Sequence, residues 1–265
     1  MRDLMRPKRG RKDSERDNKP PIRAFGRRAK PSDGLGPYPH PKKKGFRFWL
    51  LRIVLFVCMI SALPMVALRF IDPPTSAFIE LNKLNNNRNI RHEWRDLEDI
   101  SAYFPVAVIA SEDQQFPHHF GFDLKQIKLV LEDSENGLSR GASTISQQTI
   151  KNLFLWPGRS LVRKAIEAWL TAWMELIVPK QRILEVYVNF AQFGVSVFGV
   201  GAASQHYFGI PASKLTARQS ALIAASLPTP SRSNPAEPSK YLEKRAAIIQ
   251  DQMPRIGGRR LISEL

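Results

Sequence analysis

The chain has 265 residues, 43% of them hydrophobic, which is enough for one domain with a substantial core plus appended segments. It contains a single cysteine, Cys58, which excludes a disulfide framework and argues against a cysteine nucleophile or a thiolate metal site. The net charge of +16 would favour a nucleic-acid binder if it covered a folded surface, but residues 1–47 alone hold 16 Lys or Arg and only 5 Asp or Glu.

Residues 1–47 form the first segment, and they are rich in Pro, Gly and charge but poor in aliphatic side chains. Such a segment cannot bury enough apolar surface to fold alone, so we predict a basic, disordered tail. The tail has few aromatic residues among its charges for stacking on single strands, so we expect no nucleic-acid partner. Anionic lipid headgroups fit its charge better.

Residues 48–70, FWLLRIVLFVCMISALPMVALRF, are long and apolar enough to cross the hydrocarbon core of a bilayer, about 30 Å thick. Arg52 can snorkel to the interface, and Pro64 would kink a membrane helix without forbidding it. A cleaved signal peptide is the alternative, although this span exceeds the usual apolar region of about 7–15 residues. The basic cluster at positions 42–47 predicts a single-pass helix with a cytoplasmic N-terminus, which places residues 71–265 across the membrane.

From residue 75 onward the apolar residues follow helical spacing, and no convincing alternating strand pattern is present. We therefore predict a mainly α domain. Helices are expected after Asp123 (with Gln126 at capping-box spacing, ending at Gly137), from Thr144 (with Gln147) to Leu155, over about 160–178, over 180–190, and after Thr216 (with Gln219). The segment 190–198, FAQFGVSVF, fits either a dip into the outer leaflet or ordinary core.

The stretch SEDQQFPHHFGFD, residues 111–123, follows the apolar run 104–110 and places Glu112 and Asp113 at a helix end. A carboxylate beside apolar walls can have a raised pKa, which suits a general acid or base. Acids that are simply solvated at a helix end are the alternative. Two adjacent histidines at 118 and 119 lack the spacing of a zinc site.

The stretch RGASTISQQTIKN, residues 140–152, combines a glycine, hydroxyls and amides at a helix start with Lys151 farther along. Free N–H groups and a nearby cation at a helix N-terminus can hold a phosphate or pyrophosphate. The alternatives are capping alone for Ser143 and Thr144, and a solvated polar face for Gln147, Gln148 and Lys151.

A third constellation lies in RSLVRKAIEAWLTAWMELI, where Arg163 and Glu167 share a helix face and Lys164 begins an overlapping row. The alternative is an exposed ion pair that contributes only a few tenths of a kcal/mol. Trp169 and Trp173, with the same spacing, fit core or membrane-edge packing better than sugar platforms.

These stretches together, ED-QQ-F-PH-H-F-G, G-A-STI-S-QQ-TI-KN, RK-AI-E and K-QR-ILE-V-Y-V-N, resemble in order and spacing the peptidoglycan glycosyltransferases that polymerise lipid II. The likeness covers about residues 75–255 and fits the monofunctional form. It implies a mainly α, lysozyme-like glycosyltransferase domain with large and small lobes, preceded by one transmembrane helix. The implied reaction makes β-1,4-linked glycan strands by an inverting mechanism, releases undecaprenyl pyrophosphate, and needs no nucleotide or organic cofactor.

The resemblance also assigns roles to residues. Glu112 becomes the general base, and Glu167 becomes the second catalytic carboxylate, which helps to hold a divalent cation, Mg²⁺ or Mn²⁺, or orients the neighbouring cations. The implied substrate-binding residues come from all four motifs: Asp113, Phe116, His119, Gly121, Ser143, Thr144, Gln147, Gln148, Lys151, Asn152, Arg163, Lys164, Glu185, Tyr187 and Asn189, of which the last three support the cleft. Arg245 resembles the arginine of a fifth motif, whereas Gln114 and Gln115 replace a usual basic pair.

The partners that the resemblance implies are lipid II, the growing glycan strand and the membrane, with penicillin-binding transpeptidases and division proteins as protein partners. The expected location is the inner membrane, with the catalytic domain in the periplasm. Two other functions fit parts of the sequence: a membrane-anchored lytic muramidase that uses Glu112 as an acid, and a non-catalytic scaffold of the cell-wall machinery. The polar cluster in residues 140–152 favours the polymerase over the muramidase, because a hydrolase has little use for a site that binds pyrophosphate.

Overall fold

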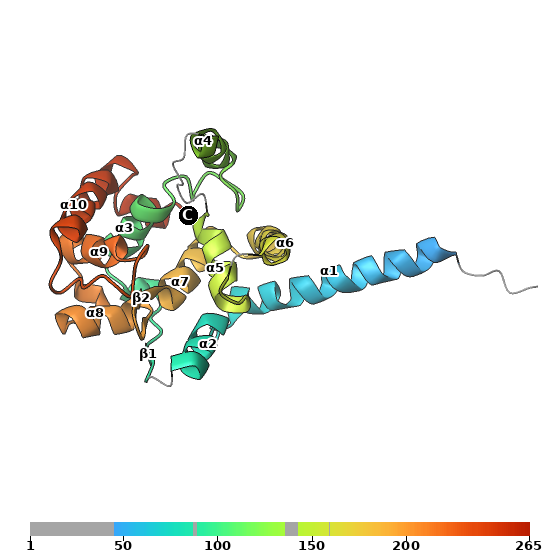
Figure 1. The fold of residues 1–265 in the computed structure, drawn as a ribbon, viewed down its shortest axis with the longest axis horizontal. Helices are drawn as coiled ribbons and strands as arrows, with labels where there is room; N and C mark the ends of the chain where they lie inside the picture. The colour runs from blue at the N-terminus through green and yellow to red at the C-terminus, as the bar shows by residue number, and fades with distance from the viewer. Residues whose placement is uncertain (1–44, 87–88, 136–142, 159) are drawn as a thin grey trace, which may run out of the picture. The chain divides into compact units, whose positions relative to one another are not determined.

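The computed structural model of the chain describes residues 45–86, 89–135, 143–158 and 160–265. These residues are mainly helical, as predicted (Figure 1). The α-helices and strands in chain order are α1 (Phe46–Phe70), α2 (Ala77–Asn86), β1 (Arg91–His92), α3 (Tyr103–Glu112), α4 (Leu124–Glu135), α5 (Ile145–Phe154), α6 (Leu161–Ile177), α7 (Lys180–Phe190), β2 (Gln192–Gly194), β3 (Val197–Phe198), α8 (Val200–Phe208), α9 (Ala217–Ala225), α10 (Lys240–Arg255) and α11 (Arg260–Ser263).

Helix α1 covers the predicted span and begins two residues earlier, at Phe46. In the described part of the chain it is the one helix long and apolar enough to cross a membrane, and most of its side chains are exposed. Near its start the guanidinium of Arg52 lies 4.3 Å from the ring centroid of Phe48. The predicted basic tail lies outside the described residues, apart from 45–47.

The C-terminal half of α1 packs against α6, and Ser61, Met65 and Leu68 are buried there. The indole Nε1 of Trp169 on α6 donates a hydrogen bond to Ser61 Oγ at 2.9 Å. Nη1 of Arg69 donates to the carbonyl oxygen of Ile177 at 2.8 Å, at the end of α6, where a cation also meets the negative end of the helix dipole. Two side-chain hydrogen bonds therefore fix α6 to α1.

The predicted helix starts are confirmed by their caps. Thr144 and Gln147 form a reciprocal capping box at the start of α5, and Thr216 with Gln219 repeats it at α9. The hydroxyl of Ser160 accepts from the backbone N–H of Arg163 and begins α6. Each cap satisfies backbone N–H groups that the first helical turn leaves without a partner. Gly137, the predicted end of α4, lies outside the described residues.

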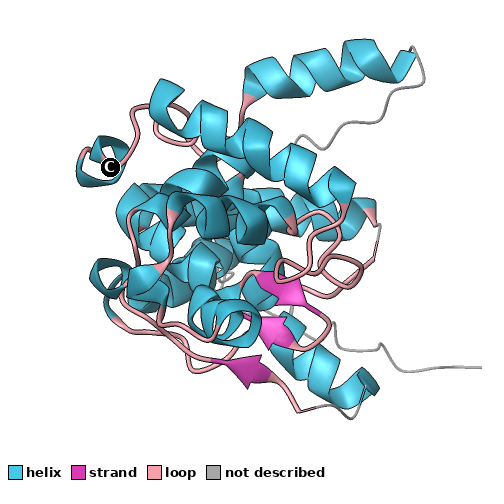
Figure 2. Cartoon of the chain, turned by 90° about the vertical axis from the view of Figure 1, so that its left-hand side faces the viewer, coloured by secondary structure: helices cyan, strands magenta, loops and turns pink. Residues whose placement is uncertain are grey.

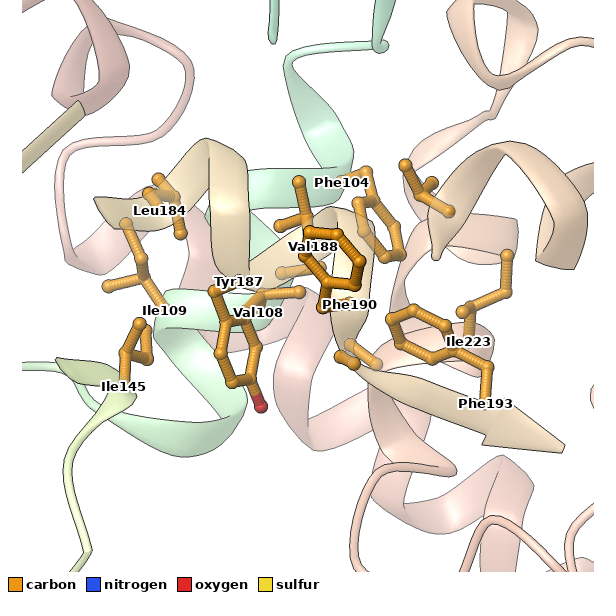
Figure 3. Packing of buried hydrophobic residues seen from close by; sticks show 14 of the residues in the cluster. Phe104, Val108, Ile109, Ile145, Leu184, Tyr187, Val188, Phe190, Phe193 and Ile223 are labelled. Atoms are coloured by element: carbon orange, nitrogen blue, oxygen red, sulfur yellow. The ribbon is translucent and has the colours of Figure 1, made fainter. Parts of the chain in front are cut away.

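Two groups of helices build the core. Helices α3, α9 and α10 pack on one another, while α5 packs on α2, α6 and α7, and α3 also contacts α7 (Figure 1). Helix α3 is apolar on all sides and is buried from Phe104 to Ala110. Figure 3 shows Phe104, Val108 and Ile109 of α3 among side chains from α5, α7, β2 and α9. Burying a side chain of this size contributes about 1.5–3 kcal/mol, so this contact holds α3 in place.

The mainly α fold is confirmed, and it includes a small three-stranded sheet in the order β1, β3, β2 (Figure 2), for which the sequence showed no alternating pattern. Strand β1 pairs with β3 in parallel, and β2 pairs with β3 antiparallel across an irregularity between Gln192 and Gly194. Strands of two or three residues are too short to show alternation. The segment 190–198 belongs to the core, since Phe190, Phe193 and Phe198 are at most 1% exposed.

Replacing Thr144 with Val is expected to lower the free energy of unfolding by about 2 kcal/mol. The hydroxyl of Thr144 accepts from the N–H of Gln147 and also donates to the carbonyl oxygen of Gly121 at 2.7 Å, and the residue is 3% exposed. Chemical denaturation in detergent measures the change. The matched control is Thr216→Val, which removes an exposed cap and should cost about 1 kcal/mol. Equal losses for the two variants would contradict the extra bond to Gly121.

Candidate active site

A first cavity of about 380 Å³ opens where α3 ends, and we call it the Glu112 cavity. Its walls come from the end of α3, the loop after it, the start of α4 and the residues before α5. The side chain of Glu112 is 14% exposed, so it reaches this cavity from a largely enclosed position. Asp113, Gln114, Gln115, Ser143 and Thr144 also line the cavity.

Three groups face the Glu112 carboxylate. The hydroxyl of Ser111 donates to Oε1 at 3.0 Å, and Nε2 of Gln148 donates to Oε2 at 3.2 Å. Nη2 of Arg245, on α10, lies 3.6 Å from Oε1 and also donates to Ser111 Oγ at 3.2 Å. Donors on both oxygens fix the carboxylate in one orientation, as a positioned proton acceptor requires. This brings the predicted arginine of the fifth motif to the site.

Tyr187 fixes the amide of Gln148 from behind. Its hydroxyl donates to Oε1 of Gln148 at 3.1 Å, which leaves the amide nitrogen to donate to Glu112. Burial raises the pKa of Tyr187 well above its ordinary value, and the negative charges of Glu112 and Asp113 add to the rise. The hydroxyl therefore stays protonated at neutral pH and remains a donor.

Asp113 joins the end of α3 to the start of α5. It is 7% exposed, and its Oδ2 accepts the backbone N–H of Ile145 at 2.9 Å. Nε2 of His119 lies 3.0 Å from each of its carboxylate oxygens. These contacts hold two site-bearing helices together, and they give Asp113 and His119 a supporting position at the edge of the Glu112 cavity.

Gly121 and Phe116 are not among the described residues that line the Glu112 cavity, although the carbonyl oxygen of Gly121 accepts from Thr144, which lines it. Gly121 has φ +77°, a backbone conformation that favours glycine, and a Cβ there would lie 2.8 Å from Cγ2 of Thr171. Both the backbone conformation and the lack of space therefore disfavour a side chain. Phe116 is fully buried, and Nζ of Lys180 lies 4.4 Å from its ring centroid. The substrate-binding roles assigned to these two residues stay predictions.

A second cavity of about 730 Å³ adjoins the first, with Ser143 lining both, and we call it the Glu167 cavity. It lies among α2, α5, α6 and a Pro-rich loop that contributes Pro228. Glu167 is 2% exposed; its Oε2 accepts from Nη1 of Arg163 at 2.7 Å, and its Oε1 accepts from Nζ of Lys164. The exposed ion pair considered from the sequence is thereby excluded.

Lys151 completes a cluster of three cations around one carboxylate. It lines the same cavity as Arg163, Lys164 and Glu167, and its Nζ lies 5.7 Å from the ring centroid of Phe78. Burial lowers the pKa of Lys151 from its ordinary value; Glu167 opposes this, and the charges of Arg163 and Lys164 add to it. With three cations against one anion, an entering anion would be attracted by the net positive charge.

Two of the predicted residues on α7 lie away from both cavities. Oε1 of Glu185 accepts from the N–H of Leu97 at 2.8 Å, and Asn189 exchanges two bonds of 2.8 Å with the backbone of Arg95. They fix the chain before α3 to α7, consistent with a supporting role. Asn152 is half-buried and is not among the described residues that line either cavity.

The sequence pattern did not point to Ser111, Phe78 or Pro228. Ser111 stands next to Glu112, and this adjacency was the only available signal. Phe78 and Pro228 reach the Glu167 cavity from α2 and from the loop after α9, so only the fold brings them there. Gln147, by contrast, was predicted and lines this cavity while also completing its cap.

Comparison with known proteins supplies an independent finding. A family model described as Transglycosylase matches residues 80–254. The chain is 50% identical over 213 residues to a Shewanella oneidensis protein named biosynthetic peptidoglycan transglycosylase, covering 79% of this chain and 91% of that protein. Proteins of the same name from Xanthomonas campestris pv. campestris (46% identical, covering 79% and 88%) and Ectopseudomonas mendocina (43% identical, covering 82% and 92%) are also similar.

Proposed function

The chain belongs to the transglycosylase family and is a peptidoglycan glycosyltransferase of cell-wall synthesis with a mainly helical, lysozyme-like domain, and we propose that it polymerises lipid II into β-1,4-linked strands. Its substrates are lipid II and the growing glycan strand. The observation that carries the proposal is the pair of adjoining cavities, one with a positioned carboxylate and one with three cations.

In this proposal the acceptor enters the Glu112 cavity. Glu112 removes the proton from its 4-hydroxyl while that oxygen attacks the anomeric carbon of the donor strand. As the new bond forms, the bond between that carbon and the pyrophosphate oxygen breaks, and the configuration inverts. The logic parallels that of inverting glycosidases, with a sugar hydroxyl in place of water. Ser111, Gln148 and Arg245 keep the base aimed at the hydroxyl.

The leaving undecaprenyl pyrophosphate is proposed to occupy the Glu167 cavity. Negative charge develops on the pyrophosphate as its bond to the anomeric carbon breaks, and Lys151, Arg163 and Lys164, which line this cavity, are proposed to stabilise that charge. Glu167 holds two of these cations in position through its buried carboxylate. Glu167 is therefore proposed to act by organising charge.

A divalent cation, Mg²⁺ or Mn²⁺, remains part of the proposal, but the protein residues do not fit a site of their own for it. Among the described residues no group of three or more His, Cys, Asp or Glu is arranged to hold a metal. Both oxygens of Glu167 are paired with cations. Mg²⁺ commonly binds substrate phosphates and water with few protein ligands, so the ion is proposed to enter with the pyrophosphate.

The location is proposed from α1 and its surroundings. We propose an inner-membrane anchor with a cytoplasmic N-terminus and a periplasmic catalytic domain, supported by the exposed apolar surface of α1 and the basic cluster before it. Leu161, Val162 and Trp169 are exposed apolar residues of α6, the helix that packs on α1, and Trp169 itself contacts α1 through Ser61. Penicillin-binding transpeptidases and division proteins are proposed as partners, since new strands must be crosslinked where the wall grows.

Purified full-length protein with labelled lipid II and Mg²⁺ tests the function. A polymer that lysozyme digests is the expected product. Release of short fragments from preformed strands, without polymer, would identify the lytic muramidase instead. If folded, membrane-reconstituted protein gives neither polymer nor fragments, the result would favour the scaffold function.

Replacing Tyr187 with Phe is expected to lower kcat by about 10-fold with little change in KM, since the loss of one buried hydrogen bond costs about 1–1.5 kcal/mol. The variant frees the Gln148 amide to turn away from Glu112, so Tyr187 acts as a positioning residue. Steady-state polymerisation over a range of lipid II concentrations separates the two constants. Tyr241→Phe, at an exposed position of α10, is the control and should match the wild type. A change in KM alone would contradict the positioning role.

A further inference from the structure

A third cavity, of about 500 Å³, lies between the small sheet, α8 and the loop 230–236, and we call it the Arg91 cavity. Its lining is rich in hydroxyl and amide groups: Asn89, Ser196, Ser231, Ser233 and Asn234. Arg91 and His206 supply its ionisable side chains together with the phenol of Tyr207, and no Asp or Glu is among the described residues that line it.

The positive charge of Arg91 has no acidic counterpart in this cavity. Its Nη1 lies 2.6 Å from Nδ1 of His206. Because a guanidinium can only donate, the imidazole nitrogen must accept and the ring is neutral. Partial burial lowers the pKa of His206, and the charge of Arg91 lowers it further, which agrees with a neutral ring. The preferred partner of a guanidinium is a carboxylate, which it can bind through two parallel hydrogen bonds.

The backbone around this pair is fixed. The N–H of Arg91 donates to the carbonyl oxygen of Ser196 at 2.8 Å, within the pairing of β1 with β3. The ring of Tyr207 lies 4.7 Å from that of His206, and its hydroxyl donates to the carbonyl oxygen of Phe193 at 2.9 Å. The guanidinium is therefore presented from a rigid frame, which lowers the entropic cost of binding.

The position of the Arg91 cavity indicates which substrate it faces. Pro228 lines the Glu167 cavity, and Pro230 of the same loop lines the Arg91 cavity. Two residues of chain span at most roughly 7 Å, so the two cavities are close neighbours. The Glu112 cavity shares no lining residue with the Arg91 cavity. The loop 228–230 thus connects the Arg91 cavity to the Glu167 cavity, in which the pyrophosphate end of the donor strand is proposed to lie.

We propose that the Arg91 cavity is a binding site for a peptide carboxylate carried by the growing glycan strand. The inference rests on the proposed function, since it takes the strand to be the donor. Peptidoglycan carries peptides along its sugars, and a peptide presents a terminal carboxylate. Arg91 would bind that carboxylate, with His206 as its neighbour and the hydroxyl and amide groups of the loop around the peptide. Such a contact would hold the strand between successive additions.

Binding of preformed strands tests the proposal without turnover. Full-length protein in detergent is titrated with glycan strands that lack pyrophosphate, either with peptides intact, with peptides removed by an amidase, or with peptide carboxylates converted to amides. The wild type is expected to bind the intact strands at least about 10-fold more tightly than the other two, the range of one charged hydrogen bond. Arg91→Ala should lose this preference, and Arg91→Lys should keep part of it.

Arg255→Ala is the matched control, because Arg255 is exposed on α10 and paired with Asp251, and it should bind like the wild type. Equal affinity of the wild type for all three strands would overturn the proposal. The proposal would also be overturned if Arg91→Ala lost as much affinity for peptide-free strands as for intact strands, since the cavity would then bind the sugars. An acidic peptide from a protein can be added as a competitor in the same assay. If only this peptide occupies the Arg91 cavity, the cavity would be assigned to a protein partner, and the proposal would be overturned. Polymerisation by the wild type, measured separately, tests the proposed function alone.

Discussion

Replacing Glu112 with Gln is expected to lower the rate of lipid II polymerisation by at least about 10²-fold while the protein stays folded. The amide keeps the size of the side chain, and its one oxygen can still accept from Ser111 and Arg245, but its nitrogen replaces the oxygen that accepts from Gln148, and the group cannot take up the proton of the acceptor hydroxyl. Because Ser111 and Arg245 still hold one end of the side chain, the variant removes the proton acceptor and alters only the contact with Gln148.

The initial rate of polymerisation at saturating lipid II measures this loss, and thermal unfolding of the same preparation checks the fold. Glu243→Gln is the control, because Glu243 is an exposed partner of Arg218 on the surface of α10 and lines neither the Glu112 cavity nor the Glu167 cavity. A Glu112→Gln protein with more than about a tenth of wild-type activity would show that another group takes the proton.

Replacing Glu167 with Gln is expected to abolish measurable polymerisation and to lower the free energy of unfolding by about 3–5 kcal/mol. Its carboxylate is 2% exposed and neutralises Arg163, whose side chain is 11% exposed, so the variant leaves a buried guanidinium without its counter-charge. Lys164 loses the same partner. The three cations would then repel one another, and their arrangement for the pyrophosphate would be lost.

Denaturant unfolding in detergent and the polymerisation assay together measure the two effects. Asp251→Asn is the matched control, since Asp251 and Arg255 form an ion pair with the same spacing along a helix but with exposed side chains. Its loss should cost less than about 1 kcal/mol. A Glu167→Gln protein as stable as this control would mean that the Arg163 charge finds another partner or remains hydrated.

Local patterns carried most of what the sequence predicted correctly. The capping boxes at Thr144 and Thr216 mark helix starts with groups only a few residues apart, and the structure places the helices there. The strands were missed because two or three residues cannot show a period, and β1 becomes a strand only by pairing with β3, more than 100 residues later.

The contacts of the candidate site also divide into those that local sequence spacing predicts and those that depend on the fold. The pairing of Arg163 with Glu167 follows from helical spacing, but its burial depends on the packing of α5 and α6. The contact of Arg245 with Ser111 joins residues 134 positions apart, and no local pattern predicts such a bond. Only the likeness to a known family indicated Arg245. The physical role of the residue followed from the geometry around Glu112 in the structure.

The attachment of α6 to α1 has a practical consequence for the search for inhibitors. Trp169, which donates a hydrogen bond to Ser61, lies two residues after Glu167, and Arg69 donates a hydrogen bond to the last residue of α6. A shortened soluble enzyme beginning after Phe70 would lose both bonds and uncover the face of α6 that α1 protects. Compounds selected against such an enzyme would be ranked on a loosened Glu167 cavity, so screening is best done with the membrane helix in place.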